Sequence, residues 1–302
     1  MFRRFLSYYK PQMGLFVADT VCALVLAAID LAFPIILRNL TGGLFTQGQA
    51  AIMQALGMIA VGLVLMYAVR CACRYFVSYW GHVMGARMES KMREDLFDQY
   101  ERFSFAYFDR NSSGDMMSRV VNDLFDICEA AHHVPEWIII CGIEIIGSFV
   151  ILFTIAPVLA LAMAVVTAAF AVIMFWQNMR MREVFSDNRK KISGINAQLQ
   201  DSLAGMRVVK SFANEETERF KFRASNNRYL SSKENMYHAM GVYTATYGLL
   251  SGVLYVIVVL LGGWLVAQGQ LQAVDMATFA LYISLFCTPL ETLVNSAETY
   301  QK

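Results

Sequence analysis

The chain alternates between long apolar runs and polar stretches rich in basic residues. A membrane-crossing helix needs about 20 apolar residues, and six runs are long enough: residues near 13–37, 52–80, 137–155, 157–178, 240–267 and 275–300. Two of the intervening segments, 81–136 and 178–239, are tens of residues long, whereas the others are short. The pattern predicts an all-α integral membrane protein with six transmembrane helices.

The two long polar segments keep the periodicity of helices. In residues 181–206, apolar side chains recur at mostly three- and four-residue steps, which places them in one stripe on a helix. The members of this stripe are Val184, Ile192, Ile195, Leu199, Leu203 and Met206. At 1.5 Å of rise per residue, about 25 helical residues extend roughly 37 Å. We therefore expect the spans to continue as long helical extensions that are joined by turns at their far ends.

Charge is segregated along the chain and predicts the topology. Of the 25 Lys and Arg residues, six lie in 81–136, twelve in 178–238 and three in the first twelve residues. Because cytoplasmic loops carry an excess of positive charge, we expect both long segments and both termini in the cytoplasm. We also expect the plasma (inner) membrane as the location of the protein. The charge forms no basic face for nucleic acid, so no nucleic-acid partner is expected.

Composition agrees with residence in the lipid bilayer. Hydrophobic residues make up 57% of the 302 residues and charged residues 16%, against about 45–50% and about 25% in soluble domains. The six cysteines lie mostly in apolar runs, which favours packing over disulfide bonds. Residues 1–12 are basic and aromatic, and no short apolar region with a cleavage site follows them, so no cleavable signal peptide is expected.

Helix-capping signals stand at the far ends of both predicted extensions. In the first, Ser113 is predicted to cap a short helix whose first turn contains Asp115, where the helix dipole favours an anion. In the second, either Ser211 or Asn214 could cap a helix whose first turn contains the acidic pair 215–216. Each extension is therefore predicted to end in a structured turn.

The sequences of these turns resemble the two intracellular loops of ATP-binding cassette (ABC) exporters. The first contains Tyr107-Phe-Asp, followed by Gly114-Asp-Met-Met-Ser-Arg-Val and Asn122-Asp. The second contains Arg207-Val-Val-Lys-Ser-Phe-Ala, with Glu215 or Glu216 after it. The resemblance covers the whole chain: a basic elbow at 1–12, then six spans and both loops in order.

The resemblance implies that each loop tip is a short coupling helix that docks on an ATP-binding domain. The residues carried over are Ser113, Gly114, Asp115, Met116 and Met117 in the first tip, and Ser211, Phe212, Ala213, Asn214, Glu215 and Glu216 in the second. It also implies that residues 13–302 pair with a second transmembrane domain as a homodimer or heterodimer. Closure of two ATP-binding domains, with ATP and Mg²⁺ bound, would switch a substrate pathway from inward- to outward-facing.

The chain itself contains no recognised catalytic or cofactor-binding motif. A phosphate-binding loop requires GxxxxGK[ST], and the nearest string, 43–49, lacks the lysine and the Ser or Thr. A Leu-Ser-Gly-Gly-Gln-like signature is absent as well. We therefore expect a transmembrane domain without its ATP-binding domain, either because the sequence is a truncated piece or because the ATPase is a separate chain.

Ionisable residues inside the spans are candidates for a polar pathway. Such groups are costly in lipid and usually face a partner, the bundle interior or water. The pathway candidates are Asp30, Glu144, Glu291 and Glu298. For the first two, a lock between spans is the alternative. Arg70 and Arg74 are expected to reach the membrane surface or to pair with an acid such as Asp19.

Two local sequence patterns are interpreted as structural rather than functional. His132 and His133 are adjacent, diverge on a helix and have no further ligands at matching spacing, so no metal site is predicted. Gly81 and Gly85 permit a close helix approach. Two other functions remain open for the whole chain: a membrane scaffold or receptor that docks cytoplasmic partners, and an ion-coupled transporter that uses Asp30 or Glu144.

Overall fold

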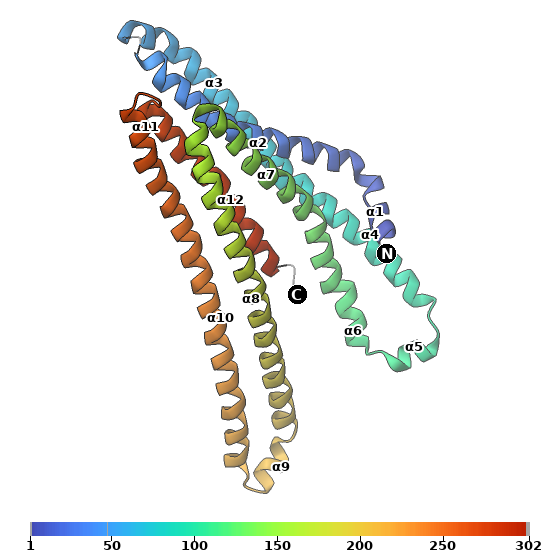
Figure 1. Ribbon diagram of the computed structural model, residues 1–302. Coiled ribbons are helices and arrows are strands. Elements are labelled where there is room, and N and C mark those ends of the chain that lie inside the picture. Colours follow the sequence, from blue (N-terminus) through green and yellow to red (C-terminus); the bar gives the residue numbers. More distant parts are fainter. Residues whose placement is uncertain (1, 47, 300–302) are drawn as a thin grey trace. The chain divides into compact units, whose positions relative to one another are not determined.

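A computed structural model describes residues 2–46 and 48–299, and these residues contain helices and connecting turns but no strands (Figure 1). The side chains of residues 2–4, 291 and 293–299 are outside the description. Among the described residues, six helical stretches are long and apolar enough to cross a membrane. The principal helices in these stretches are α2 (Met13–Gly42), α3 (Gln49–Phe76), α7 (Leu124–Ile155), α8 (Pro157–Ala204), α10 (Glu215–Ile257) and α12 (Ala273–Thr299). The predicted all-α, six-span architecture is confirmed.

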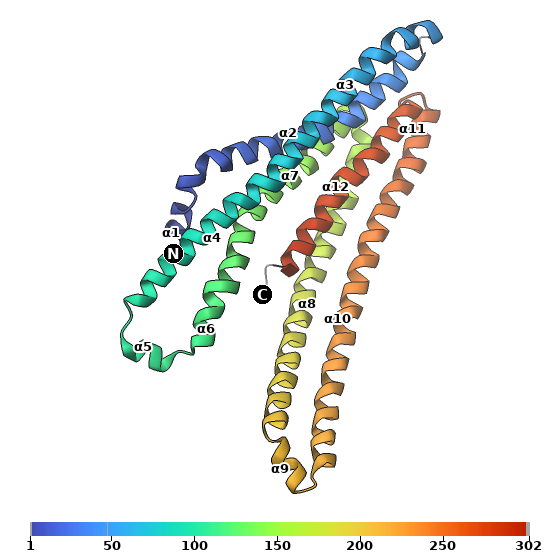
Figure 2. The ribbon, with the colours of Figure 1, turned by 180° about the vertical axis from the view of Figure 1, so that it is seen from behind.

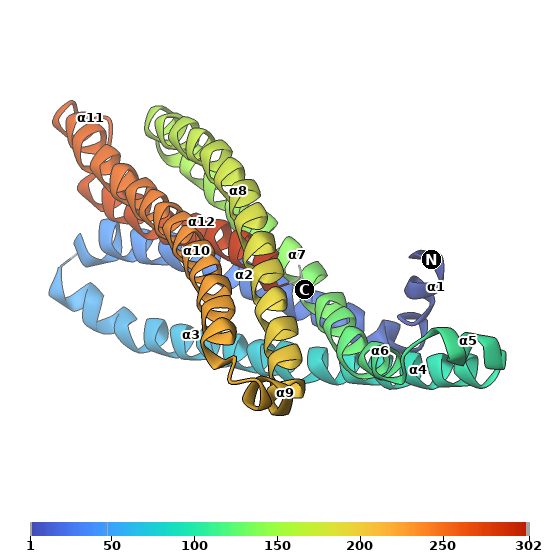
Figure 3. The ribbon, with the colours of Figure 1, turned by 90° about the horizontal axis from the view of Figure 1, so that it is seen from below.

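Two pairs of helices extend far beyond the apolar runs, as the periodicity predicts. We call residues 81–136 the first extension hairpin. It contains α4 (His82–Glu101), α5 (Phe105–Arg110), α6 (Ser113–Ser118), a π-helical turn at Arg119–Asp123 and the start of α7. We call residues 178–239 the second extension hairpin. It comprises the end of α8, the short helix α9 (Met206–Ser211) and the beginning of α10. The two long helices run side by side where α9 joins them (Figures 1, 2 and 3).

The joints between helices follow local chain chemistry. Helix α8 begins at Pro157, directly after Ala156 adopts an extended conformation that ends α7. Proline suits this first helical position because its missing N–H would have no partner there and its φ angle is already helical. A π-helical turn at Val77–Gly81 joins α3 to α4, and another at Val258–Gly262 joins α10 to α11 (Gly263–Ala267).

The chain forms two compact units, residues 1–160 with 258–302 and residues 161–257. In the first unit, α7 packs against α2, α4 and α12, and α2 also packs against α3 and α12. The interior contains the fully buried side chains of Leu152, Leu159, Phe279, Tyr282 and Phe286. These residues come from α7, α8 and α12, so the interior is built from spans that are distant in sequence.

The N-terminal elbow is anchored to the first extension hairpin. It consists of α1 (Phe2–Ser7) and a 3₁₀ turn (Lys10–Gln12). The hydroxyl of Tyr9, a buried residue, donates a 2.7 Å hydrogen bond to the backbone carbonyl of Ala131 on α7. The hydroxyl of Tyr8 donates to Asp95 on α4, also at 2.7 Å. These two bonds attach the elbow to both limbs of the hairpin.

In the second unit, hydrogen bonds link α8 to α10 at four levels. Nε2 of Gln177 donates to Thr246 at 2.9 Å, and Ser232 donates to Asp187 at 3.1 Å. Nearer the turn, the Ser225 hydroxyl bonds Gln198, and the Ser202 hydroxyl donates to Glu218 at 2.8 Å. Partners further along α8 lie correspondingly earlier in α10. These cross-links hold the two helices in one antiparallel register and make the second extension hairpin a braced pair.

Candidate functional site

The tip of the first extension hairpin is the short helix α6, which begins at Ser113. Its N-cap is Ser112, whose hydroxyl oxygen accepts a 3.1 Å hydrogen bond from the backbone N–H of Gly114. The prediction of Ser113 as the cap was therefore wrong by one residue, because Ser112 has the extended backbone of an N-cap whereas Ser113 is already helical. Asp115 lies in the first turn, as predicted.

The aromatic residues near this tip divide into two groups. The ring of Tyr107 packs against the ring of Phe103 at a tilt of 33°, with centroids 4.1 Å apart, and this contact connects the two sides of the turn between α4 and α5. Phe105 has the opposite environment and is 91% exposed. Met117, on α6, is also exposed. The first tip therefore presents apolar side chains that its own hairpin does not cover.

The short helix of the second tip lies earlier in the chain than expected. It is α9, Met206–Ser211, rather than a helix over 211–216. The Ser211 hydroxyl donates back to the carbonyl of Arg207 at 2.8 Å, so Ser211 ends a helix and caps none. Residues 212–214 form the turn, in which Ala213 has a positive φ of 50°. This left-handed conformation, which is uncommon for a non-glycine residue, reverses the chain direction.

Asn214, the alternative cap, stands directly before α10, which begins at Glu215. Its side-chain oxygen accepts a 2.6 Å hydrogen bond from the Thr217 hydroxyl, and Glu215 and Glu216 lie in the first turn of α10 as predicted. Negative charge at this position complements the positive end of the helix dipole.

The second tip also exposes large apolar side chains. Phe212 is 79% exposed, and Phe220 and Val208 are exposed beside it. These residues line a groove of about 910 Å³ between the ends of α8 and α10, which Gln198 and Arg228 also border. The arrangement offers an apolar surface at the end of a braced hairpin.

Hydrogen bonds to the Glu218 carboxylate stabilise the base of this groove. Glu218 accepts hydrogen bonds from Lys221 at 2.6 Å and from Ser202 at 2.8 Å. The bond from the Lys221 ammonium and the bond from the Ser202 hydroxyl lower the pKa of the Glu218 carboxyl below its usual value of 4.5. The carboxylate is therefore ionised at neutral pH and holds α8 against α10.

Within the spans, Asp30 forms a lock between helices. Its carboxylate accepts from Nε of Arg70 at 2.9 Å and from the terminal nitrogen of the same side chain at 3.3 Å. Arg70 was expected to reach the membrane surface or pair with an acid such as Asp19. The pairing with an acid of α2 is confirmed, but the partner is Asp30 rather than Asp19.

Of the other pathway candidates, Glu144 lies close enough to the Asp30–Arg70 pair to interact electrostatically with both side chains. Glu144 borders a cavity of about 410 Å³ together with Arg74, Glu136 and Pro289. This cavity is bounded by α7 and α12 and by the junction between α3 and α4. Glu291 and Glu298 belong to α12, but their side chains lie outside the described residues. The pathway role of all four candidates stays a prediction.

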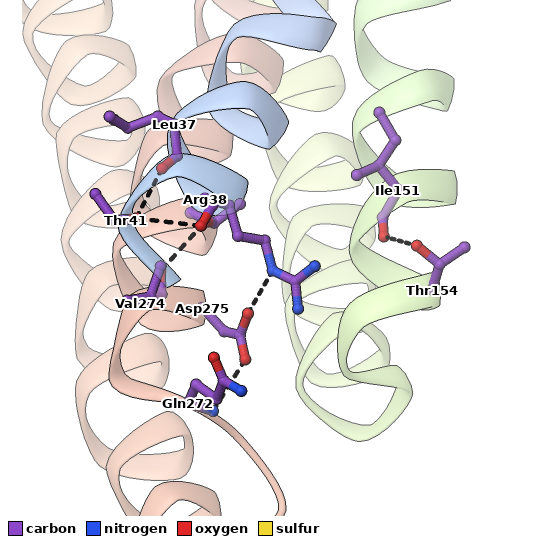
Figure 4. Close-up of polar contacts among 9 residues, drawn as sticks. Leu37, Arg38, Thr41, Ile151, Thr154, Gln272, Val274 and Asp275 are labelled. Atoms are coloured by element: carbon purple, nitrogen blue, oxygen red, sulfur yellow. Dashed lines mark hydrogen bonds and ion pairs between the residues drawn. The ribbon is translucent and has the colours of Figure 1, made fainter. Parts of the chain in front are cut away.

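The sequence did not predict the ion pair between Arg38 and Asp275. Arg38, near the end of α2, donates from Nε to Asp275 on α12, and the other Asp275 oxygen accepts the backbone N–H of Gln272 at 2.9 Å (Figure 4). The second bond is half of a capping box at the start of α12. Two features of the sequence could have indicated this pair: Arg38 is the only basic residue in the short segments between predicted spans, and Asp275 is the first residue of the last predicted span.

Six long apolar helices, basic helical extensions and two short tip helices define an all-α, multi-pass membrane transporter domain. The chain belongs to the family of the ABC transporter transmembrane region, whose model matches residues 16–290. The resemblance identified from the loop motifs is thereby confirmed.

Three curated relatives illustrate this membership. The chain is 31% identical over 302 residues to "Uncharacterized ABC transporter ATP-binding protein YwjA" of Bacillus subtilis (strain 168), covering 100% of this chain and 52% of the relative. It is 23% identical over 292 residues to "Uncharacterized ABC transporter ATP-binding protein YknU" of the same organism, covering 97% and 49%. It is 22% identical over 309 residues to "ATP-dependent lipid A-core flippase" of Syntrophus aciditrophicus (strain SB), covering 100% and 50%. The chain thus spans about half the length of these relatives.

Proposed function

We propose that this chain is the substrate-translocating domain of an ATP-driven exporter that works by alternating access. The observation that carries the proposal is the exposure of apolar side chains at the tips of both extension hairpins, above all Phe212 at 79% and Phe105 at 91%. Large apolar groups at the end of a structured element, beyond the apolar spans, mark a surface for another protein. The proposed occupants are two ATP-binding domains with ATP and Mg²⁺.

The construction of the hairpins supports force transmission. Hydrogen bonds at four levels cross-link α8 to α10 between Gln177 and Glu218. Because these bonds oppose bending of the two helices, a force applied to the second tip would be transmitted to their apolar part. In this proposal both hairpins and both termini are cytoplasmic, the membrane is the plasma (inner) membrane, and two such domains form a homodimer or heterodimer around the pathway.

The proposed cargo is amphipathic, in keeping with a relative whose name describes a lipid A-core flippase. Ion-coupled transport is disfavoured by the pairing of Asp30 with Arg70, which holds one of its two candidate carboxylates in an ion pair between helices. A docking scaffold would use the same exposed tips but needs no ATP-driven movement.

The test measures that movement directly. Asn227, an exposed residue on α10, is replaced by cysteine and spin-labelled in a variant with the six native cysteines changed to serine or alanine. Pulsed electron resonance then gives the distance between labels in the dimer, in vesicles, with the ATP-binding domains present. We expect ATP and Mg²⁺ to shift the distance distribution, and a matched variant whose ATP-binding domain cannot bind ATP to show no shift. Identical distance distributions with and without ATP in the active protein would overturn the proposal and favour the docking scaffold as the function.

A further inference from the structure

A histidine cluster lies where the first extension hairpin leaves the apolar part of the first unit. His82 is the first residue of α4, directly after the π-helical turn at Val77–Gly81. It contacts two consecutive residues of α7, with ring centroids 4.7 Å from His132 and 5.2 Å from His133. The rings of His132 and His133 are themselves 4.0 Å apart. Three of the four histidines in the chain therefore meet at one helix crossing.

Close helix approach makes this cluster possible. A side chain at Gly85 would place its Cβ 3.1 Å from Nδ1 of His132, closer than most side chains tolerate. At Gly81 it would lie 3.4 Å from a carboxylate oxygen of Asp19. The predicted close approach at these glycines is confirmed. Consecutive residues of a helix point about 100° apart, and α4 comes near enough for His82 to touch both imidazoles.

The hydrogen bonds of two histidines leave one nitrogen of each available to a ligand. Nδ1 of His82 lies 2.6 Å from the carbonyl oxygen of Ser78, and Nδ1 of His132 lies 3.2 Å from that of Cys128. A carbonyl only accepts, so each Nδ1 carries the proton and each Nε2 keeps its lone pair. A carbonyl that fixes the tautomer and orients the ring in this way is the usual support of a metal-bound histidine.

One of these nitrogens is buried without a partner. His132 is 3% exposed, and its Nε2 has no hydrogen-bond partner among the described residues; nor has Nδ1 of His133. Buried polar atoms are almost always paired, so an orphan of this kind points to a ligand, ion or water. Glu129 completes the group, with a carboxylate oxygen 3.5 Å from Nε2 of His133.

We propose that His82, Glu129, His132 and His133 form a binding site for a divalent transition-metal ion of the zinc type. Each residue offers one ligand atom, and these atoms all lie within 4.8 Å of one another. Bonds of about 2.0–2.1 Å from a tetrahedral Zn²⁺ place its ligands roughly 3.4 Å apart, so the ion would draw these side chains closer together. Three imidazoles and a carboxylate suit zinc, copper or nickel far better than Mg²⁺, which prefers oxygen.

The surrounding charges favour a dication. Besides Glu129, the acidic residues Asp19 and Glu136 lie around the histidines, and an oxygen of Glu136 is 4.0 Å from Nδ1 of His133. The adjoining cavity contributes one guanidinium, that of Arg74. A metal bound here would join α4 to α7 at the membrane end of the first extension hairpin. The sequence predicted no metal because the His132–His133 pair was considered alone, and the fold supplies His82 from a helix 50 residues away.

The experiment is a Zn²⁺ titration of the purified chain in lipid nanodiscs, with X-ray absorption at the zinc edge to count imidazole ligands. We expect one Zn²⁺ per chain, bound in the presence of excess Mg²⁺. Replacing His82 or His132 with alanine should weaken binding at least tenfold, the lower end of the loss seen when even a supporting group of a metal site is removed. His82 is exposed, so its variant tests the site without disturbing the core.

The matched control is His238→Ala, which removes the remaining histidine, on α10 in the other unit. Unchanged affinity in this control, together with one imidazole fewer in the His82→Ala absorption spectrum, supports the site. The proposal is overturned if the chain binds no stoichiometric Zn²⁺, if Mg²⁺ displaces it, or if His238→Ala weakens binding as much as His82→Ala.

Discussion

Truncation of Phe212 tests the proposed docking surface with little risk to the fold. The side chain is 79% exposed, at the end of a hairpin and in a turn. Its replacement by alanine removes few contacts within the chain, so we expect the free energy of unfolding to change by no more than about 0.5 kcal/mol. Any larger loss of function would then come from a contact with a partner.

The size of that loss follows from the exposed area. An aromatic side chain buries 150–250 Å², so 79% exposure leaves about 160 Å² for a partner to cover. At about 25 cal/mol per Å², complete coverage contributes about 4 kcal/mol, of which an alanine methyl would keep about a quarter. The Phe212→Ala variant should therefore bind an ATP-binding domain with an affinity lower by about 3 kcal/mol, or roughly 100-fold, as an upper bound.

The assay measures binding of the purified ATP-binding domain to the chain in lipid nanodiscs, with thermal unfolding measured in parallel. Phe175→Ala is the matched control, because Phe175 is also exposed, at 61%, but lies in the membrane part of α8. We expect weaker binding for the Phe212 variant alone. Binding within twofold of the unaltered chain, in a variant with unchanged unfolding temperature, would refute the reasoning from exposed area to docking.

The remaining predictions concern the polar contacts. Asp30→Asn and Arg70→Gln should each destabilise the first unit, and the double variant should lose less than the sum, with a coupling of about 0.5–3 kcal/mol in a double-mutant cycle of thermal unfolding. Tyr9→Phe, which removes the elbow bond, should cost about 1 kcal/mol in the same assay. The native pKa of Glu218 lies below its unfolded value of 4.5, so its stabilisation is present above pH 4.5 and is lost as the pH falls through the native pKa. Denaturant unfolding should therefore show a steeper acid loss than in Glu218→Gln, and equal slopes would contradict this assignment.

The sequence predicted the long elements because their signals are redundant. Each span repeats an apolar signal over some 20 residues, and one misplaced residue changes nothing. Capping is a single-residue signal, and there the predictions of Ser113 and Ser211 were wrong, although the alternative Asn214 does stand directly before α10. Ser112 and Ser113 are chemically identical candidates, and only the backbone conformation distinguishes them. In the second tip, Ser211 bonds back into α9, and the turn begins one residue later.

The polar contacts were less predictable, because they depend on which helices cross and at what depth. Arg70 is separated from Asp30 by 40 residues, and the helix crossing rather than any spacing decides between Asp30 and Asp19. The histidine cluster has the same origin. His132 and His133 alone diverge, and the third imidazole comes from α4. Gly81 and Gly85 were the one local signal that two helices meet at that point.

Polar contacts along α2 indicate how the first unit would move. Arg38 of α2 pairs with Asp275 of α12. Seven residues earlier on α2, the carbonyl of Leu31 accepts a 2.5 Å hydrogen bond from the hydroxyl of Tyr282, which is also on α12. Two links about 10 Å apart along α2 oppose both sliding and rotation of α12 against it. Asp30 adds a link to α3 beside the second of these. Since the Tyr9 bond ties the elbow before α2 to α7, we expect a force applied to the first extension hairpin to displace α2, α3, α7 and α12 together.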